Sequence, residues 1–265
     1  MRRVVVIGIG TGNPQHMTVQ AIEALNRLDA VFIPRKGESK ADLAELRREI
    51  CRRFISNPAT RLVEFDLPAR DPREPAYGKR VTDWHEGIAD IYCNLLSNEG
   101  EDATIGLLVW GDPALYDSTL RILDNAAAKS DFAFEIKVIP GVTSVQALAA
   151  SHAIPLNDIG APFVVTTGRR LREDGFPIGV DTALVMLDGE CSFKTLKDIA
   201  HYDIWWGAYL GMENEITLAG PLDRMASAIV TTRQQARARY GWIMDIYLLR
   251  RHRAPRVPSD AQRTP

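Results

Sequence analysis

The stretch RVVVIGIGTGNP, residues 3–14, begins with a short β-branched run that stops at a glycine-rich turn. The run has the length and composition of a buried strand. An amphipathic segment follows at residues 18–28, for which Thr18 is the expected N-cap. A strand, a glycine turn and a helix in this order are typical of α/β proteins, in which such turns face a ligand. The opening residues therefore predict the first strand–helix unit of an α/β fold.

The same alternation continues through the first half of the chain. Strands are expected at residues 30–33, 61–65 and 104–109, and helices at residues 41–54, 78–97 and 115–128. Short apolar runs that alternate with longer amphipathic segments predict a mostly parallel sheet with helices on both faces.

The pattern changes near residue 126, after which strand-like runs dominate and few helices are expected. These runs lie at residues 134–139, 163–167, 183–187, 204–210, 215–219 and 242–249. They predict a second sheet of mixed direction. We therefore expect an N-terminal α/β domain over residues 1–125 and a C-terminal α/β domain over residues 126–251. The basic, proline-rich residues 252–265 are expected to be a disordered tail.

Composition excludes several functional classes. The 265 residues are 46% hydrophobic and carry a formal net charge of −2, so no overall positive charge favours nucleic acid as a partner. Cys51, Cys93 and Cys191 are far apart and form no CxxC pair, which indicates neither a metal site nor a disulfide framework. We expect a cytoplasmic protein that contains no metal. No run reaches the roughly 18 apolar residues of a membrane span, so no membrane partner is expected.

Two further turns follow predicted strands. Residues 110–116, WGDPALY, follow one of them, and residues 140–144, PGVTS, follow another. The Asp112 carboxylate can bond ribose hydroxyls or an ammonium group, although Gly-Asp-Pro alone also forms a good type I turn. The first turn is not a dinucleotide fingerprint, because Asn13 occupies the third glycine position.

The order and spacing of the three turns resemble those of the tetrapyrrole methylase family over residues 4–249. The resemblance implies two α/β domains with S-adenosylmethionine in a cleft between them. It also implies S-adenosylhomocysteine as a product, a small tetrapyrrole as the substrate, and a homodimer. Carried over position by position, the expected cofactor-binding residues are Thr11, Trp110, Gly111, Asp112, Leu115, Thr143, Ser144, Met186 and Gly211.

One branch of the family is particularly similar. Residues 10–18 (GTGNPQHMT), residues 111–119 (GDPALYDST), and Tyr77 with Trp84 and His85 carry this similarity. The resemblance implies a methyltransferase of aerobic cobalamin synthesis that methylates precorrin-5 at ring carbon C1 and releases acetate. The alternatives are another precorrin methyltransferase, a methyltransferase that acts on RNA or a translation factor, and a non-catalytic tetrapyrrole carrier.

The two chemical steps make different demands on the protein. Methyl transfer to an electron-rich carbon needs close positioning and no metal. Loss of the acetyl group benefits from a general base or an oxyanion donor, for which His85, Tyr116 and Asp117 are the candidates. A buried helical role for His85 and a capping role for Asp117 are the structural alternatives.

Four basic residues are candidates for binding the carboxylates of the substrate. Arg35 and Lys36 follow one predicted strand, and Arg169 and Arg170 follow another. Arginine pairs well with carboxylates, and both pairs lie where loops can face a ligand. A plain solvated loop is the alternative at each position.

Overall fold

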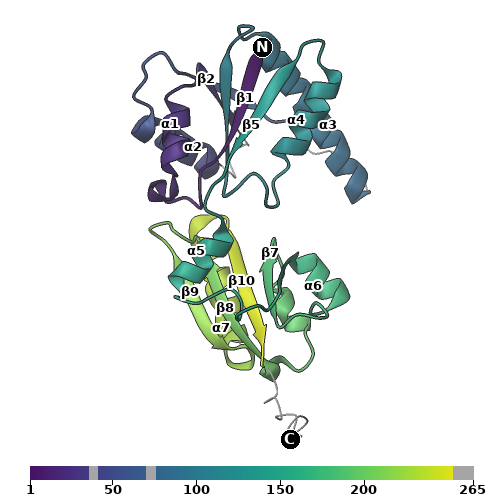
Figure 1. The fold of residues 1–265 in the computed structure, drawn as a ribbon. Helices are drawn as coiled ribbons and strands as arrows, with labels where there is room; N and C mark the ends of the chain where they lie inside the picture. Colours follow the sequence, from purple (N-terminus) through teal and green to yellow (C-terminus); the bar gives the residue numbers. More distant parts are fainter. Residues whose placement is uncertain (36–40, 70–75, 253–265) are drawn as a thin grey trace, which may run out of the picture. The chain divides into compact units, whose positions relative to one another are not determined.

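The computed structural model describes residues 1–35, 41–69 and 76–252. The chain forms two compact units, Met1–Ser144 and Val145–Pro265, and Figure 1 shows strands and helices in each of them. Each unit contains one five-stranded sheet. The α/β class, the parallel first sheet and the mixed second sheet are confirmed.

All strands of the first sheet are parallel, in the order β3-β2-β4-β1-β5. The strands are β1 (Arg2–Gly8), β2 (Ala30–Arg35), β3 (Arg61–Asp66), β4 (Thr104–Val109) and β5 (Phe134–Ile139). The helices are α1 (Val19–Leu25), α2 (Ala41–Phe54), α3 (Tyr77–Ser97) and α4 (Thr119–Lys129). The Ala21 N–H donates to Thr18 Oγ1 at 3.1 Å, which confirms the predicted N-cap of α1.

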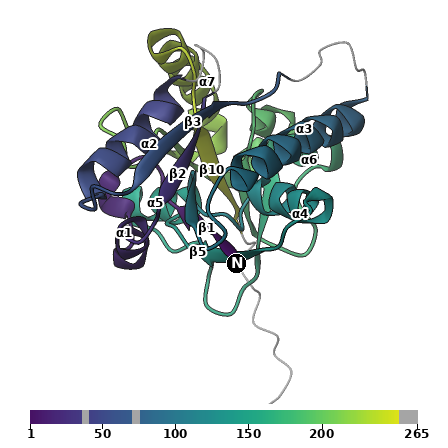
Figure 2. The same ribbon diagram turned by 90° about the horizontal axis from the view of Figure 1, so that it is seen from above.

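Helices cover both faces of this sheet because successive strand side chains point to opposite sides. Val4 and Val6 of β1 belong to a core with residues of α3 and α4. Val5 and Ile7 belong to a second core with residues of α1 and α2. Figure 2 shows the two helix pairs on opposite sides of the strands.

The boundary between the units differs from the expected one. Residues 134–139, which we assigned to the C-terminal domain, are β5 and pair in parallel with β1. β5 is an edge strand in which exposed and partly buried residues alternate. Glu135 and Lys137 are exposed, and Phe134 and Ile136 are partly buried. Such alternation is typical of half-exposed antiparallel strands, so it made β5 resemble the second sheet. The structure divides after Ser144 instead of after residue 125.

The second sheet has the order β6-β7-β10-β8-β9. Only β6 and β7 pair in parallel, and the remaining pairs are antiparallel. The strands are β6 (Phe163–Thr167), β7 (Thr182–Met186), β8 (Tyr202–Ala208), β9 (Ile216–Pro221) and β10 (Asp245–Arg251). The helices are α5 (Ser144–Ser151), α6 (Gly168–Asp174) and α7 (Leu222–Tyr240).

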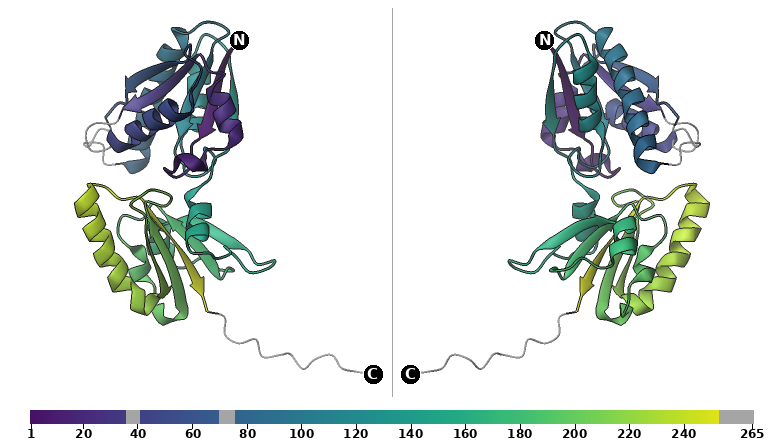
Figure 3. Two further views of the ribbon diagram at one scale, coloured as in Figure 1. Left: turned by 90° about the vertical axis from the view of Figure 1, so that its left-hand side faces the viewer. Right: turned by 90° about the vertical axis from the view of Figure 1, so that its right-hand side faces the viewer.

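The expectation of few helices in the second half missed α7, which spans 19 residues. Its buried positions are Leu222, Ile229, Arg233 and Ala236, which recur at helical spacing. Because one of the four is an arginine and the rest of the helix is mostly polar, the apolar stripe is inconspicuous in the sequence. Figure 3 shows α7 lying along one face of the second sheet.

The described part of the chain ends with an ordered residue. The N–H of His252 donates to the carbonyl of His201, and its ring lies 3.0 Å from Asp203. The rest of the expected tail, residues 253–265, lies outside the described residues. Within the described ranges, no helix is both long and apolar enough to cross a membrane.

Candidate functional site

The three glycine-containing turns lie together at the carboxyl edge of the first sheet. They follow β1, β4 and β5, which are neighbouring parallel strands, so all three turns leave the sheet at the same edge. The Gly111 N–H donates to the Gly10 carbonyl at 2.8 Å, and the Gly10 N–H donates back at 3.3 Å. This edge is where open α/β sheets bind ligands.

Glycine is required at this edge because three backbones approach one another closely. A Cβ on Gly141 would lie 2.2 Å from the Gly111 carbonyl oxygen and 2.7 Å from the Gly8 carbonyl carbon. A Cβ on Gly8 would lie 2.6 Å from the Gly141 nitrogen. All of these neighbours are backbone atoms, which cannot move aside as a flexible side chain does. The three turns therefore form one tightly packed backbone unit.

Asp112 connects two of the turns. Its Oδ2 accepts the N–H of Gly141 at 2.9 Å, and its Oδ1 accepts the N–H of Ala114 at 2.8 Å. The Leu115 N–H also donates to the Asp112 carbonyl, which closes the expected turn. The carboxylate thus holds the loop after β4 against the turn after β5.

Gly111 is buried next to this packed unit, with room beside its Cα. Its φ is +67°, a conformation that favours glycine. Among the described residues, a Cβ built there would meet only the Cα of Thr143, at 4.0 Å, so side chains leave the space beside the Gly111 Cα unfilled. Trp110, Leu115, Thr143 and Ser144 are all partly buried around this edge. The residues present thus fit a ligand that contacts backbone and hydroxyl groups.

Thr11 is more deeply buried than Trp110, Leu115, Thr143 and Ser144. Its side chain is buried, and its hydroxyl lies 2.9 Å from Nδ1 of His16. The Thr11 hydroxyl therefore fixes the turn after β1 by bonding His16, a pairing that the sequence analysis did not identify.

The three candidates for the acetyl step have different surroundings. Tyr116 is 44% exposed at the carboxyl edge, has a φ of +52°, and has its pKa raised by partial burial. Asp117 Oδ1 accepts the Thr119 N–H at 2.7 Å, so Asp117 bonds the first N–H of α4 from one residue before the N-cap position, Ser118. His85 is partly buried in α3 beside Trp84, with ring centroids 5.6 Å apart.

The basic candidate at the first sheet has acidic neighbours. Arg35 ends β2 and forms an ion pair with Asp66 at 2.8 Å, and Glu64 lies 3.9 Å away. Lys36 lies outside the described residues.

The remaining predicted residues lie at one edge of the second sheet. Met186 ends β7, and Gly211 follows β8, which runs in the same direction because β10 lies antiparallel between them. Arg169 and Arg170 are exposed in the first turn of α6, and Arg170 pairs with Asp174 at 3.1 Å. They belong to the same edge, since a Cβ on Gly168 would lie 2.4 Å from Asp188 Cγ, just beyond β7.

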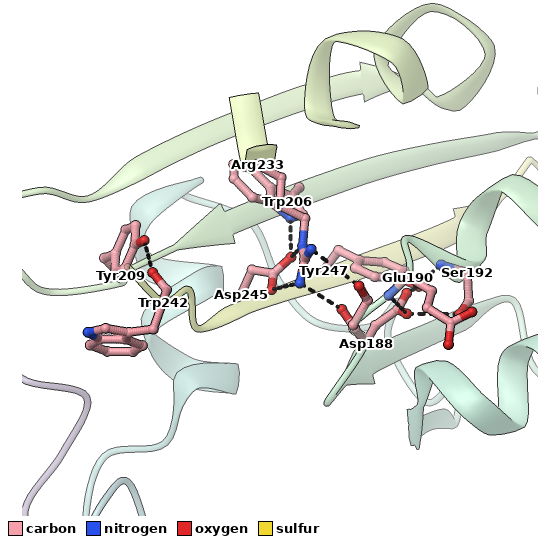
Figure 4. A network of polar contacts seen from close by, with 10 residues as sticks. Asp188, Glu190, Ser192, Trp206, Tyr209, Arg233, Trp242, Asp245 and Tyr247 are labelled. Carbon is pink, nitrogen blue, oxygen red and sulfur yellow. Dashed lines mark hydrogen bonds and ion pairs between the residues drawn. The ribbon is translucent and has the colours of Figure 1, made fainter. Parts of the chain in front are cut away.

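A buried polar network supports this second edge, and the sequence analysis missed it (Figure 4). Asp188 accepts hydrogen bonds from the Tyr247 hydroxyl at 2.6 Å, the Ser192 N–H at 2.6 Å and the Ser192 hydroxyl at 2.8 Å. Arg233 donates to the Asp188 carbonyl at 3.1 Å and forms two hydrogen bonds with Asp245. The loop after β7 is thereby held by α7 and β10.

Leu187, which precedes Asp188, has an unusual backbone conformation. This residue has a φ of +53° and is 67% exposed, between Met186 and the buried Asp188. A non-glycine residue in the left-handed region costs about 1 kcal/mol or more and persists where its surroundings enforce it. The bonds to Asp188 supply that enforcement. A strand that ends in Met-Leu-Asp-Gly is a weak signal in the sequence alone.

We predict that Tyr247→Phe makes the second unit less stable near neutral pH and makes that stability less dependent on pH in acid. Burial by itself raises the pKa of Asp188, but the bonds from Tyr247, Glu190 and Ser192 outweigh it and hold that pKa below its ordinary value. The resulting stabilisation is complete above the ordinary pKa and is lost as the pH falls through the lowered one. Without the Tyr247 hydroxyl the lowering is smaller, so the unit is less stable by about 1–2 kcal/mol near neutral pH. Acid then removes less stabilisation from the variant, and its difference from wild type narrows as the pH falls. Urea unfolding at several pH values measures both effects, and identical pH profiles for variant and wild type would contradict the prediction.

The fold and the two edges define a class of protein. The chain is an α/β protein of two units. In the first, three glycine-containing turns pack together at the carboxyl edge of a parallel sheet. In the second, hydrogen bonds to Asp188 hold the loop after β7 at the edge of a mixed sheet. Among the residues that the structure describes, no group of His, Cys, Asp or Glu could hold a metal ion. Open α/β sheets of this kind bind small ligands at the carboxyl edge of their strands.

Comparison with known proteins defines the family. Residues 3–226 match the model of the Tetrapyrrole (Corrin/Porphyrin) Methylases, so the chain belongs to this family. It is therefore a methyltransferase that uses S-adenosylmethionine. The chain is 53% identical to precorrin-6A synthase (deacetylating) of Sinorhizobium sp over 252 residues, which are 95% of this chain and 96% of that protein.

Solved structures agree with this assignment. A putative cobalamin synthesis related protein (CobF) from Corynebacterium diphtheriae has a TM-score of 0.82 and 36% identity, over 96% of this chain and all of that one. Uroporphyrin-III C-methyltransferase from Thermus thermophilus, solved with S-adenosyl homocysteine, has a TM-score of 0.56 at 16% identity, over 93% of this chain and 91% of that one. The second likeness shows the shared fold.

Proposed function

We propose that the chain is a C-methyltransferase of aerobic cobalamin biosynthesis that methylates precorrin-5 at C1 and releases acetate to give precorrin-6A. The observation that carries this proposal is the 53% identity to precorrin-6A synthase over nearly the whole of both chains. The glycine-lined edge supports it, because a methyl transfer governed by positioning needs a rigid cradle more than it needs acid or base groups.

The proposed cofactor-binding residues are those that the family resemblance assigns in each unit. S-adenosylmethionine, when bound, supplies an electrophilic methyl group on a positively charged sulfur. Gly111 gives backbone access, while Asp112 keeps the cradle closed by bonding Gly141. The proposed contact residues are Thr11, Trp110, Gly111, Asp112, Leu115, Thr143 and Ser144 in the first unit and Met186 and Gly211 in the second.

The proposed substrate contacts are basic groups beside those edges. Arg169 and Arg170 are exposed next to the Asp188 loop, and Arg35 ends β2 beside Asp66. A substrate that bears several carboxylates can exchange the exposed ion pairs of Arg35 and Arg170 at small cost, since such pairs contribute at most about 1 kcal/mol. Lys36 is proposed in the same role from the sequence alone.

For the acetyl step we propose Tyr116 as the hydrogen-bond donor, with His85 and Asp117 as further candidates. Tyr116 is exposed at the carboxyl edge, and its raised pKa keeps the hydroxyl protonated, as a donor to a developing oxyanion must be. Asp117 already bonds the first N–H of α4, which favours an orienting role for it.

We predict that Tyr116→Phe separates the two steps. Acetate release is expected to fall about 100-fold, while methyl transfer and the Kd for S-adenosylhomocysteine stay close to wild type. His85→Gln serves as the comparison, because it lacks an imidazole base and keeps a polar side chain. Methylated product that retains its acetyl group, quantified by mass spectrometry, reports the separation. Unchanged acetate release in Tyr116→Phe with loss in His85→Gln would assign the step to His85.

A substrate panel distinguishes the functional classes. The purified chain is incubated with radiolabelled S-adenosylmethionine and with precorrin-5, other precorrins, ribosomal RNA or translation factors. We expect label only in precorrin-5. Label in another precorrin would change the member of the family, and label in RNA or protein would support a macromolecular substrate. Cofactor binding with no acceptor would overturn the proposal, and absence of cofactor binding would favour a carrier.

We further propose a cytoplasmic homodimer that does not bind nucleic acid. The three cysteines are unpaired, as in a reducing compartment, and the net charge of −2 provides no general attraction to phosphate backbones. Light scattering after size exclusion measures the oligomeric state, and a mass equal to one chain would contradict the dimer.

A further inference from the structure

The hydrogen-bonded ladder between β2 and β4 stops before either strand ends. β2 remains paired with β3 as far as Arg35 and Asp66, and β4 remains paired with β1 as far as Val109 and Gly8. The pairing of β2 with β4, however, ends at Phe32 and Leu107. A gap in the sheet therefore lies at the carboxyl edge, directly before the loop of residues 110–117.

Pro34 accounts for this gap. The Val109 carbonyl accepts the Ile9 N–H on the β1 side, and successive carbonyls in a strand alternate in direction, so the Leu108 carbonyl faces β2. Continuing the register beyond Phe32 and Leu107 places the nitrogen of Pro34 opposite that carbonyl. Proline has no N–H to donate to a ladder. Strand β2 therefore cannot satisfy the Leu108 carbonyl.

Arg47 of α2 supplies the missing donor. Its Nε donates to the Leu108 carbonyl at 2.9 Å. Burial lowers the pKa of the Arg47 guanidinium, and the charge of Asp117 acts in the opposite direction, so the two groups lie within electrostatic reach of each other. Leu108 precedes the loop of residues 110–117, and Asp117 ends it. One side chain thus interacts with both ends of the loop that carries Gly111 and Asp112.

We propose that Arg47 is a positioning residue that fixes the loop of residues 110–117 and thereby sets the affinity for the cofactor. The proposal rests on the proposed function, because that function assigns the loop to S-adenosylmethionine. Arg47 itself need not touch the ligand, since its hydrogen bond acts on the backbone before the loop and its charge acts on the carboxylate at the end of the loop.

The test compares two neighbouring arginines of α2. Arg47→Met keeps the length and packing of the side chain but removes its donor and charge. Arg48→Met is the matched control, because Arg48 forms exposed ion pairs with Glu45 and Glu64. We expect Arg47→Met to weaken S-adenosylhomocysteine binding about tenfold in calorimetry. The KM for S-adenosylmethionine should rise by the same factor with kcat within about threefold, as for interactions lost equally from ground and transition states. Arg48→Met should remain within about twofold of wild type.

A rescue variant separates loop placement from general stability. Pro34→Ala returns an N–H to the position opposite the Leu108 carbonyl. In the Pro34→Ala/Arg47→Met double variant we expect at least about a threefold recovery of affinity over Arg47→Met. If Arg47 only stabilised the fold, Arg47→Met would lower the thermal stability, and Pro34→Ala would not restore the affinity for S-adenosylhomocysteine. If Arg47→Met does not fold, Arg47→Gln replaces it, with an expected loss of about threefold or more.

The outcomes are distinct. A wild-type chain that fails to bind S-adenosylhomocysteine overturns the proposed function. A wild-type chain that binds, with Arg47→Met or Arg47→Gln within about twofold of it, overturns the inference alone. If Arg47→Met loses affinity and the double variant does not regain it, the inference that Arg47 positions the loop through the Leu108 carbonyl is also overturned.

Discussion

Replacement of Arg233 by methionine is expected to destabilise the second unit by about 3–5 kcal/mol, enough to unfold it under mild conditions. The Arg233 and Asp245 side chains are 10% and 8% exposed, and Nε of Arg233 lies 2.9 Å from Asp245 Oδ2. Without the guanidinium, Asp245 keeps only the 3.0 Å bond from the Trp206 ring N–H among the described residues. An unpaired buried carboxylate then has to be protonated or exposed. The carbonyls of Asp188 and Gly189 also lose their donor.

Chemical denaturation followed by circular dichroism measures this loss. Arg237→Met is the matched control, because Arg237 is exposed in the last turn of the same helix. We expect that control to change the free energy of unfolding by less than about 0.5 kcal/mol. A loss in Arg233→Met no larger than that of the control would show that the network does not stabilise the unit.

The second large effect is expected from Gly141→Ala, which we predict to lower kcat/KM by about 100-fold or more. The added Cβ would lie 2.2 Å from the Gly111 oxygen and 2.7 Å from the Gly8 carbonyl carbon. Because those atoms are backbone, the turns after β1, β4 and β5 must separate. The Asp112 bond to the Gly141 N–H would then be strained or broken. A displacement of about 1 Å suffices for such a loss when catalysis depends on positioning.

The control for Gly141→Ala is Gly100→Ala, since a Cβ on Gly100 meets no atom within 4 Å. Steady-state kinetics and calorimetry with S-adenosylhomocysteine are measured for both variants after circular dichroism has shown that they are folded. Activity of folded Gly141→Ala equal to that of Gly100→Ala would contradict the role of the glycine-lined edge.

Local patterns were sufficient for much of the fold. The strand runs are apolar or alternating over four or more residues, and each has a strand at or within a few residues of the predicted range. The N-cap Thr18 was visible because a hydroxyl stood directly before an apolar helical pattern. The helix expected from residue 115 begins at Thr119, because the Asp112 carbonyl accepts the Leu115 N–H in a turn and the Asp117 side chain accepts the Thr119 N–H just before the helix.

Features that depend on long-range pairing could not be predicted. Arg47 reaches Leu108 only because the sheet order places β2 beside β4, and nothing in either segment indicates that order. The network joins Asp188 to Arg233 and Tyr247, which lie 45 and 59 residues further along the chain. Arg233 was moreover hidden in a helix whose polar composition concealed its buried side. The contacts of Arg47 and Arg233 depend on sheet order and tertiary packing, which local sequence propensity does not predict.

We propose above that this chain transfers a methyl group to precorrin-5 and removes its acetyl group. The most direct measurement is mass spectrometry of the product formed from labelled S-adenosylmethionine and precorrin-5, with acetate quantified in the same reaction. We expect one labelled methyl group per product molecule and one equivalent of free acetate. An unmodified precorrin-5, or a methylated product formed without any acetate, would contradict it.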